Sequence, residues 1–286
     1  MDDKITKLIE IYKKMLDFVD ADVKQAIHDH VKTQRGFKDT CFVIFAKSTK
    51  TYRAIQQLCN NGLGYGEDAI ILTRSLLENL INLAYIANPQ KEEEREHRAE
   101  LFANWLLIDL KRKIDKSRHN DPLKLQLEAH FKRYQSIGAD YDKMNELHKE
   151  ECRKVKPNSD PSKNWSWSGL SLGGMAKDVD SSIPQTKLYT TYHNESYWLY
   201  SQIVHLHPGG CNSYMKSSPT GNGIVIHDEL GPEWIKESLC SSFEYYSKIV
   251  ELINNIFNLN LTKLYDIAKD YVAIVEELYS DSDKSA

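Results

Sequence analysis

The segment AIILTRSLLENLINLAYIA, residues 69–87, is apolar on almost every side when it is wound into a helix. Such a helix must be surrounded by other apolar surfaces, so we expect it at the centre of a helical domain. Arg74, Glu78 and Asn82 interrupt the run. Because charged side chains at these positions would be costly in lipid, we interpret the segment as a core helix, with no membrane contact, and expect a soluble, cytoplasmic protein.

Apolar residues recur at helical spacing along most of the chain, and this pattern predicts an all-α fold. The expected architecture is an irregular bundle of about eight to nine helices, with one long irregular segment at 157–184 and at most a minor hairpin at GNGIVI, residues 221–226. The expected helices cover residues 2–31, 37–59, 68–88, 91–118, 122–155, 172–179, 185–205, 232–257 and 262–279.

The length of 286 residues exceeds the usual domain size but is compatible with one large helical domain. We expect a single domain over 1–286, made of N-terminal helices (1–60), a central part (61–260) and a C-terminal helix and tail (261–286). A chain of this length buries enough surface to fold without disulfides or metal ions.

Composition excludes some classes of protein. A net charge of −4, with 41% hydrophobic and 27% charged residues, is ordinary for a globular protein and excludes a strongly basic nucleic-acid coat. The cysteines are scattered, without CxxC pairs, and there is no HExxH motif. We therefore expect a reduced cytosolic protein with no metal site and no cofactor.

Two rows of polar residues stand on apolar helices. Tyr197, Ser201 and His205 follow one another at steps of four, as Arg74 and Glu78 do on the central helix. Residues four apart lie on one face of a helix. Because a buried arginine and glutamate each lose several kcal/mol of hydration, they need partners. We predict that the two helices face each other and that these five side chains form one polar cluster.

This cluster has two interpretations that the sequence leaves open. It could be a structural latch that fixes the register of two helices, or a functional site. His205 stands at a helix end beside the loop that begins Pro208-Gly209-Gly210, a common place for sites to open. His207, next to this loop, and His227, within it, could also belong to the site, although a lone histidine in such a position more often has no functional role.

The order of several motifs resembles a known family. Arg74-x3-Glu78, then NWSWSGLSLGGMAKDV, then YSQIVHLHP are similar to the bacterial family of unknown function 5677, over about residues 60 to 260. His207, between His205 and Pro208, departs from the simplest family pattern. The resemblance implies an all-α fold and a shared polar cluster; it implies no activity.

One functional hypothesis is a metal-independent endoribonuclease that resembles the HEPN superfamily of toxin and antiphage proteins. RNA cleavage needs a proton-transfer group and a cation that stabilises the phosphorane. His205 would transfer the proton, Arg74 would hold the phosphate, and Glu78 would orient Arg74, with Ser201 or Tyr197 hydrogen-bonding nearby. RNA, a second copy of the chain, or a defence-system protein would be the partners.

The superfamily's own motif, Arg-x4–6-His, occurs only as Arg112-x6-His119, which we interpret as a solvated basic helix end. The alternative hypothesis is a non-catalytic interaction or ligand-binding module. Its contact surface would be the loop at 211–231 with Trp165 and Trp167, although two tryptophans in an irregular segment more often cover a core. The basic clusters around Lys113 and Lys149 could contact phosphates, but a solvated face is favoured.

Overall fold

In the computed structural model, the apolar segment forms α4 (Gly66–Ala87) and lies between two other long helices, α3 (Phe37–Asn60) and α12 (Pro232–Phe257). Leu76, Leu80 and Ile81 on α4 are fully buried. The expected central position of this helix is therefore confirmed. Within the described residues, α4 alone is long and apolar enough to cross a membrane, but 67% of its most apolar stretch is buried inside the protein, as in a core helix.

The structure describes residues 3–31, 36–62, 65–117, 122–136, 138–164, 166–183, 187–204, 215–217, 224–226 and 232–280. The remaining elements are α1 (Asp3–Phe18), η1 (Val19–Val23), α2 (Lys24–Val31), α5 (Glu92–Lys116), α6 (Pro122–Ser136), α7 (Tyr141–Val155), η3 (Pro161–Lys163), α8 (Leu172–Ser182), α9 (Leu188–Tyr192), η4 (His193–Tyr197), α10 (Trp198–Val204), β1 (Met215–Ser217), β2 (Ile224–Ile226) and α13 (Lys263–Ser280).

The all-α prediction is confirmed. Because α1, η1 and α2 are continuous, as are α9, η4 and α10, the described part contains ten helices besides the short 3₁₀ turn η3. The two short strands form an antiparallel hairpin in which Lys216 pairs with Val225, in agreement with the minor hairpin expected there.

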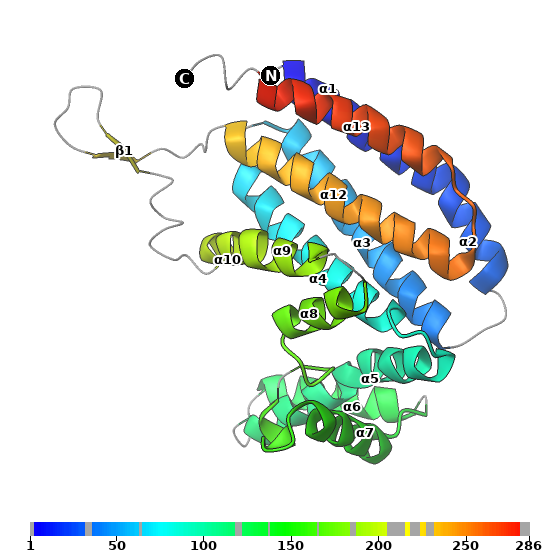
Figure 1. Cartoon of the computed structure of the whole chain (residues 1–286). Coiled ribbons are helices and arrows are strands. Elements are labelled where there is room, and N and C mark those ends of the chain that lie inside the picture. The colour runs from blue at the N-terminus through cyan, green and yellow to red at the C-terminus, as the bar shows by residue number, and fades with distance from the viewer. Residues whose placement is uncertain are drawn as a thin grey trace.

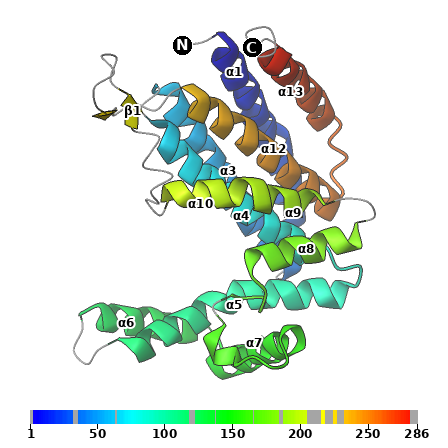
Figure 2. The same cartoon turned by 60° about the vertical axis from the view of Figure 1, so that its left-hand side comes forward.

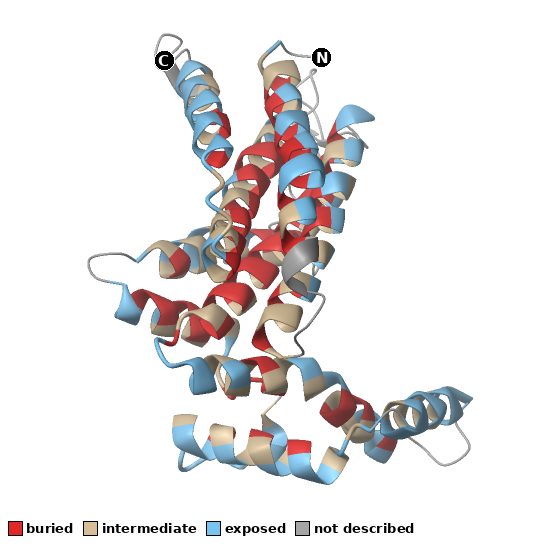
Figure 3. Cartoon of the chain, turned by 90° about the vertical axis from the view of Figure 1, so that its right-hand side faces the viewer, coloured by how far each residue is buried: buried red, intermediate tan, exposed pale blue. Residues whose placement is uncertain are grey.

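The helices form three groups (Figure 1). The long helices α1, α3, α4, α12 and α13 run roughly alongside one another, and α8 and the α9–α10 helix cross over α4. Helix α5 lies below them with α6 and α7 (Figure 2). Burial is concentrated in the long helices, whereas α6 extends outward and contains no buried residue (Figure 3). The polar residues of α4 thus lie beneath the crossing helices.

The single helix expected over Pro122–Val155 is wrong. The chain forms α6 and α7, separated near Gly138, whose φ of 91° lies in the left-handed region that favours glycine. Asp140 then starts α7, because its side chain accepts the Lys143 N–H at 3.1 Å. A glycine followed by an N-cap aspartate was a readable stop-and-start signal in the sequence.

A stack of three buried tyrosines joins α1, α3 and α12. The ring of Tyr52 lies 3.6 Å from that of Tyr12 and 4.1 Å from that of Tyr246, centroid to centroid. The Tyr12 hydroxyl pairs with Ser242 and that of Tyr246 with Thr49, both at 2.8 Å. The buried Tyr52 hydroxyl has no hydrogen-bond partner among the described residues.

Replacing Tyr52 with phenylalanine is therefore expected to stabilise the protein by about 1 kcal/mol, because it removes an unsatisfied hydroxyl and keeps the ring. Urea denaturation would measure the change. Tyr12→Phe is the control, and it should be destabilising because it breaks the bond to Ser242. A Tyr52→Phe variant that is at least as destabilised as the control would contradict this prediction.

Candidate functional site

The predicted meeting of α4 with the α9–α10 helix is present, and Arg74 is its centre. The Arg74 Nε donates to Glu78 Oε1 at 3.2 Å, and its Nη2 donates to the Tyr197 hydroxyl at 2.8 Å. The guanidinium carbon lies 4.6 Å from the centroid of the Tyr197 ring. The Arg74 side chain is only 14% exposed, whereas Glu78 is 39% exposed, so solvent reaches the cluster from the Glu78 side.

The other two predicted members are placed differently. Ser201 lies on α10, but its hydroxyl donates to the backbone carbonyl of Tyr197 at 2.6 Å rather than to Arg74 or Glu78. His205 lies outside the described residues, as do His207 and His227. Arg74, Glu78 and Tyr197 are thus brought together, and we use the name "Arg74 cluster" for these three.

Asn82 continues the polar row of α4 and binds a different segment. Its Oδ1 accepts the Trp167 indole N–H at 2.7 Å, and its Nδ2 donates to the Glu78 carbonyl at 2.7 Å. Trp167 is only 7% exposed and packs edge-on against Tyr85 and Phe102. It therefore covers the core and is no exposed contact surface; Trp165 lies outside the described residues.

Two carboxylates hold the α9–α10 helix against the bundle. Asp180 on α8 is 8% exposed, and its two oxygens accept the N–H groups of Tyr189 at 3.1 Å and Thr190 at 2.7 Å. On α10, the Tyr200 hydroxyl donates to Glu237 at 2.6 Å. Burial raises the pKa of Tyr200 well above its ordinary value, so the phenol stays protonated and remains a donor.

Asp180→Ala is expected to lower the free energy of unfolding by about 2 kcal/mol, because it leaves two N–H groups at the start of α9 without an acceptor. Asp180→Asn, which keeps one acceptor oxygen, should lose about half as much. Chemical denaturation would give both values. Equal losses in the two variants would show that the charge, and not the capping geometry, is what matters.

The structure adds a residue that the sequence reasoning missed, His193. It precedes Tyr197 by four residues, and the two rings stack at 5.1 Å with an interplanar angle of 15°. Both belong to η4, a π-helical turn, and such turns occur frequently at functional sites. The same step of four that singled out Tyr197, Ser201 and His205 could have found His193.

Gly173, at the start of α8, packs against the His193 ring. A Cβ built on Gly173 would lie 2.7 Å from His193 Cε1 and 3.0 Å from Nε2, so no other residue fits without moving the imidazole. Ser171 caps this helix by accepting the Gly174 N–H at 3.1 Å. Two other segments therefore reach the η4 turn: α4, whose Arg74 contacts Tyr197, and the first turn of α8, whose Gly173 contacts His193.

Gly173→Ala tests this packing by a double-mutant cycle with His193→Ala. In the wild type the added methyl group displaces the ring, and we expect a loss of about 1 kcal/mol, the low end for overpacking, because the imidazole is the end of a flexible side chain. In the His193→Ala background the collision is absent, and alanine should stabilise the helix by about 0.5–1 kcal/mol. Denaturation of the four proteins measures the coupling. Additive effects would mean that the ring does not lie against Gly173.

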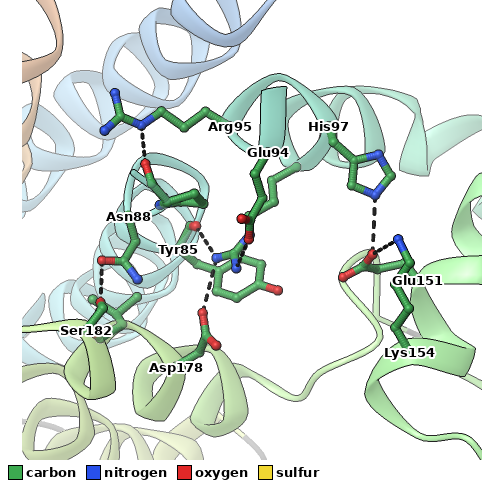
Figure 4. A network of polar contacts seen from close by, with 12 residues as sticks. Tyr85, Asn88, Glu94, Arg95, His97, Glu151, Lys154, Asp178 and Ser182 are labelled. Carbon is green, nitrogen blue, oxygen red and sulfur yellow. Dashed lines mark hydrogen bonds and ion pairs between the residues drawn. The ribbon is translucent and has the colours of Figure 1, made fainter. Parts of the chain in front are cut away.

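A second polar network, which includes Tyr85, Glu94 and Asp178, ties α4, α5 and α8 together (Figure 4). Arg98 donates to the Tyr85 carbonyl at 2.8 Å, to Asp178 at 3.1 Å and to Glu94 at 2.9 Å. Its guanidinium lies 3.8 Å from the Tyr85 ring centroid, and the side chain is 12% exposed. Burial raises the pKa of Tyr85 to about 12. Nearby, His97 pairs with Glu151 on α7 at 3.3 Å.

The basic cluster of α5 is largely paired. Lys111 contacts Asp115 and Lys113 contacts Asp109, both at 2.6 Å. Arg112 lies over the Trp105 ring at 5.2 Å and donates to the carbonyl of Asn164. The expected solvated position of Arg112 is therefore wrong: it holds the irregular segment in place. His119, its partner in the Arg-x6-His match, lies outside the described residues.

A cavity of about 700 Å³ lies elsewhere in the molecule, between the start of α3 and α5. Asp39, Glu96, Glu100, Phe102 and other residues of these two helices line it. None of them belongs to the Arg74 cluster, so this cavity and the cluster are separate features. Within the described residues, no group of three or more histidine, cysteine or acidic side chains could hold a metal ion.

The fold and the cluster together define an all-α protein with a mostly buried arginine between two crossing helices. The chain belongs to the family described as "Family of unknown function (DUF5677)", whose model matches residues 38–223. The match confirms the resemblance seen in the sequence, although it starts and ends earlier than the 60–260 span expected. It includes the Arg74 cluster, His193 and Gly173. No curated protein and no solved structure matches the chain.

Proposed function

We propose that the protein cleaves RNA and that the Arg74 cluster binds the scissile phosphate. The observation that carries the proposal is the geometry of Arg74: two hydrogen bonds fix a guanidinium at the edge of the core, beside a glutamate that solvent reaches. A guanidinium that is already oriented can bind phosphate oxygens at two points and stabilise the charge of the phosphorane.

The remaining roles follow from the chemistry of the reaction. Glu78 orients Arg74, and the Tyr197 hydroxyl accepts a hydrogen bond from the Arg74 guanidinium. Ser201 lies one turn after Tyr197 on the α9–α10 helix. Proton transfer needs an imidazole on this row, and the sequence prediction assigned that role to His205. Such a set needs no metal ion and is of the HEPN type. We place the enzyme in the cytoplasm of bacteria, in a toxin or antiphage system, with a second copy or a defence protein as partner.

The test is to incubate the purified full-length chain with total RNA and to analyse the new ends. Attack by the 2′-hydroxyl leaves 2′,3′-cyclic phosphate and 5′-hydroxyl ends, and cleavage should persist with a chelator present. DNA, which lacks that hydroxyl, should stay intact. Expression of wild-type protein should slow growth, and expression of the Arg74→Lys variant should not. RNA that stays intact at stoichiometric protein, with equal growth of the two strains, would refute the proposal.

One observation favours a second candidate, a structural latch in a non-catalytic binding module. The Arg74 side chain is mostly buried, and both Nε and Nη2 already have acceptors. Breaking such a pair leaves an uncompensated charge, which is strongly destabilising. An Arg74→Ala variant that loses several kcal/mol of stability but keeps full cleavage would favour the latch.

A further inference from the structure

The Tyr197 ring brings an imidazole into contact with the Arg74 cluster, and it is not the histidine singled out from the sequence. His193 stacks on Tyr197 at 5.1 Å, and the Arg74 guanidinium carbon lies 4.6 Å from the same ring centroid. A cation from α4 and a titratable group from η4 therefore share one aromatic ring. We infer that His193 is the proton-transfer group of this site; the inference rests on the proposed function.

The hydrogen bonding of His193 favours a free Nε2. Its Nδ1 lies 3.2 Å from the Asn194 side-chain oxygen, which can only accept, so Nδ1 carries the hydrogen. In a neutral imidazole the other nitrogen, Nε2, then has a lone pair and can take a proton. Among the described residues, the hydrogen-bond contact that the structure gives the His193 ring is that of Nδ1 with Asn194. The ring atoms Cε1, Nε2 and Nδ1 all lie close to Gly173.

The His193 ring has a close neighbour on each side. Tyr197 stacks against it, and Gly173 meets it so closely that a single methyl group would collide. His193 itself is only half-buried, so its ring lies near the surface. A histidine in this position can reach a bound substrate, as a proton-transfer group must.

His193 alone can carry out both proton transfers of RNA cleavage. His193 Nε2 takes the proton of the 2′-hydroxyl as the O2′–P bond forms, and Arg74 stabilises the charged phosphorane. The P–O5′ bond then breaks, and the same imidazolium returns its proton to the leaving 5′-oxygen. The products are a 2′,3′-cyclic phosphate and a 5′-hydroxyl. No electron is gained or lost, and no other reactant is needed.

The experiment compares the full-length wild type with His193→Ala and with His130→Ala. His130, an exposed residue of α6, is the matched control. We expect His193→Ala to slow cleavage by about 100- to 10 000-fold, and added free imidazole to restore part of the rate, because it can enter the vacated space. The control should cleave like the wild type. A merely structural histidine would not respond to imidazole.

Binding separates the inference from the proposed function. The probe is the dinucleotide dUpA, which lacks the attacking hydroxyl, and we expect Arg74→Lys and His193→Ala each to weaken its binding by about tenfold. If the wild type binds dUpA and both variants bind it more weakly, but no RNA is cleaved, the proposed function is overturned. Arg74 and His193 would then share a phosphate-binding surface without catalysis. Normal cleavage and binding in His193→Ala, or a loss that imidazole does not rescue, would overturn the inference, as would loss of cleavage in His205→Ala alone.

Discussion

Arg74→Lys is expected to lower the rate of RNA cleavage by about 100- to 1000-fold, the usual loss when one donor to a charged transition state is removed. Lysine keeps the positive charge but cannot contact Glu78, Tyr197 and a phosphate in one plane. The measurement is single-turnover cleavage by purified protein, with the thermal midpoint recorded for each variant.

Arg98→Lys is the matched control for Arg74→Lys. Like Arg74, Arg98 is mostly buried on a long helix, pairs with a glutamate four residues away and lies over a tyrosine ring, but it is outside the Arg74 cluster. We expect it to lose stability and to keep the cleavage rate of its folded fraction. If both lysine variants lose the same activity, or neither does, Arg74 has no special role in the reaction.

Arg98→Ala is expected to lower the free energy of unfolding by about 3 kcal/mol. The substitution leaves the Tyr85 carbonyl and the Asp178 carboxylate without their donor and removes the guanidinium from the Tyr85 ring. Because Asp178 and Glu94 are 38% and 49% exposed, water can solvate them, so we expect less than the full penalty of a sealed ion pair. Urea denaturation measures the loss.

A control for Arg98→Ala is Lys143→Ala, since the ion pair of Lys143 with Glu100 at 3.2 Å is exposed on both sides. That variant should change stability by less than about 0.5 kcal/mol. A similar change in both variants would show that the Arg98 network contributes no more than an ordinary surface pair, and α8 would then owe its position to apolar packing alone.

The sequence predicted most of the helices and the meeting of Arg74 with Tyr197. Both depend on periodicity, which is local and needs no knowledge of the fold. A buried arginine needs a partner, and a second polar row with the same spacing offered one. These two observations were enough to pair two segments more than a hundred residues apart.

The parts that the sequence did not predict depend on single contacts between distant residues. Nothing in the residues around Asp180 indicates that it accepts the N–H groups of α9, and nothing in the residues around Arg98 indicates that it donates to the Tyr85 carbonyl and to Asp178. The place of His193 depends on a glycine in another helix and on a π-helical turn. Such contacts do not recur at a regular spacing along the chain, so no local sequence pattern predicts them.

The π-helical turn η4 also fixes the phase of everything that follows it. A turn with i→i+5 bonds accommodates one residue more than an α-helical turn. If one residue were deleted between Thr191 and Trp198, the helix could continue as a regular α-helix, and the part from Trp198 onward would keep its orientation, because the π-turn already absorbs the extra residue. Tyr200 and Ile203 would then stay in the core. Relatives with one residue fewer in this stretch should therefore keep these apolar residues on the same face of an uninterrupted α-helix.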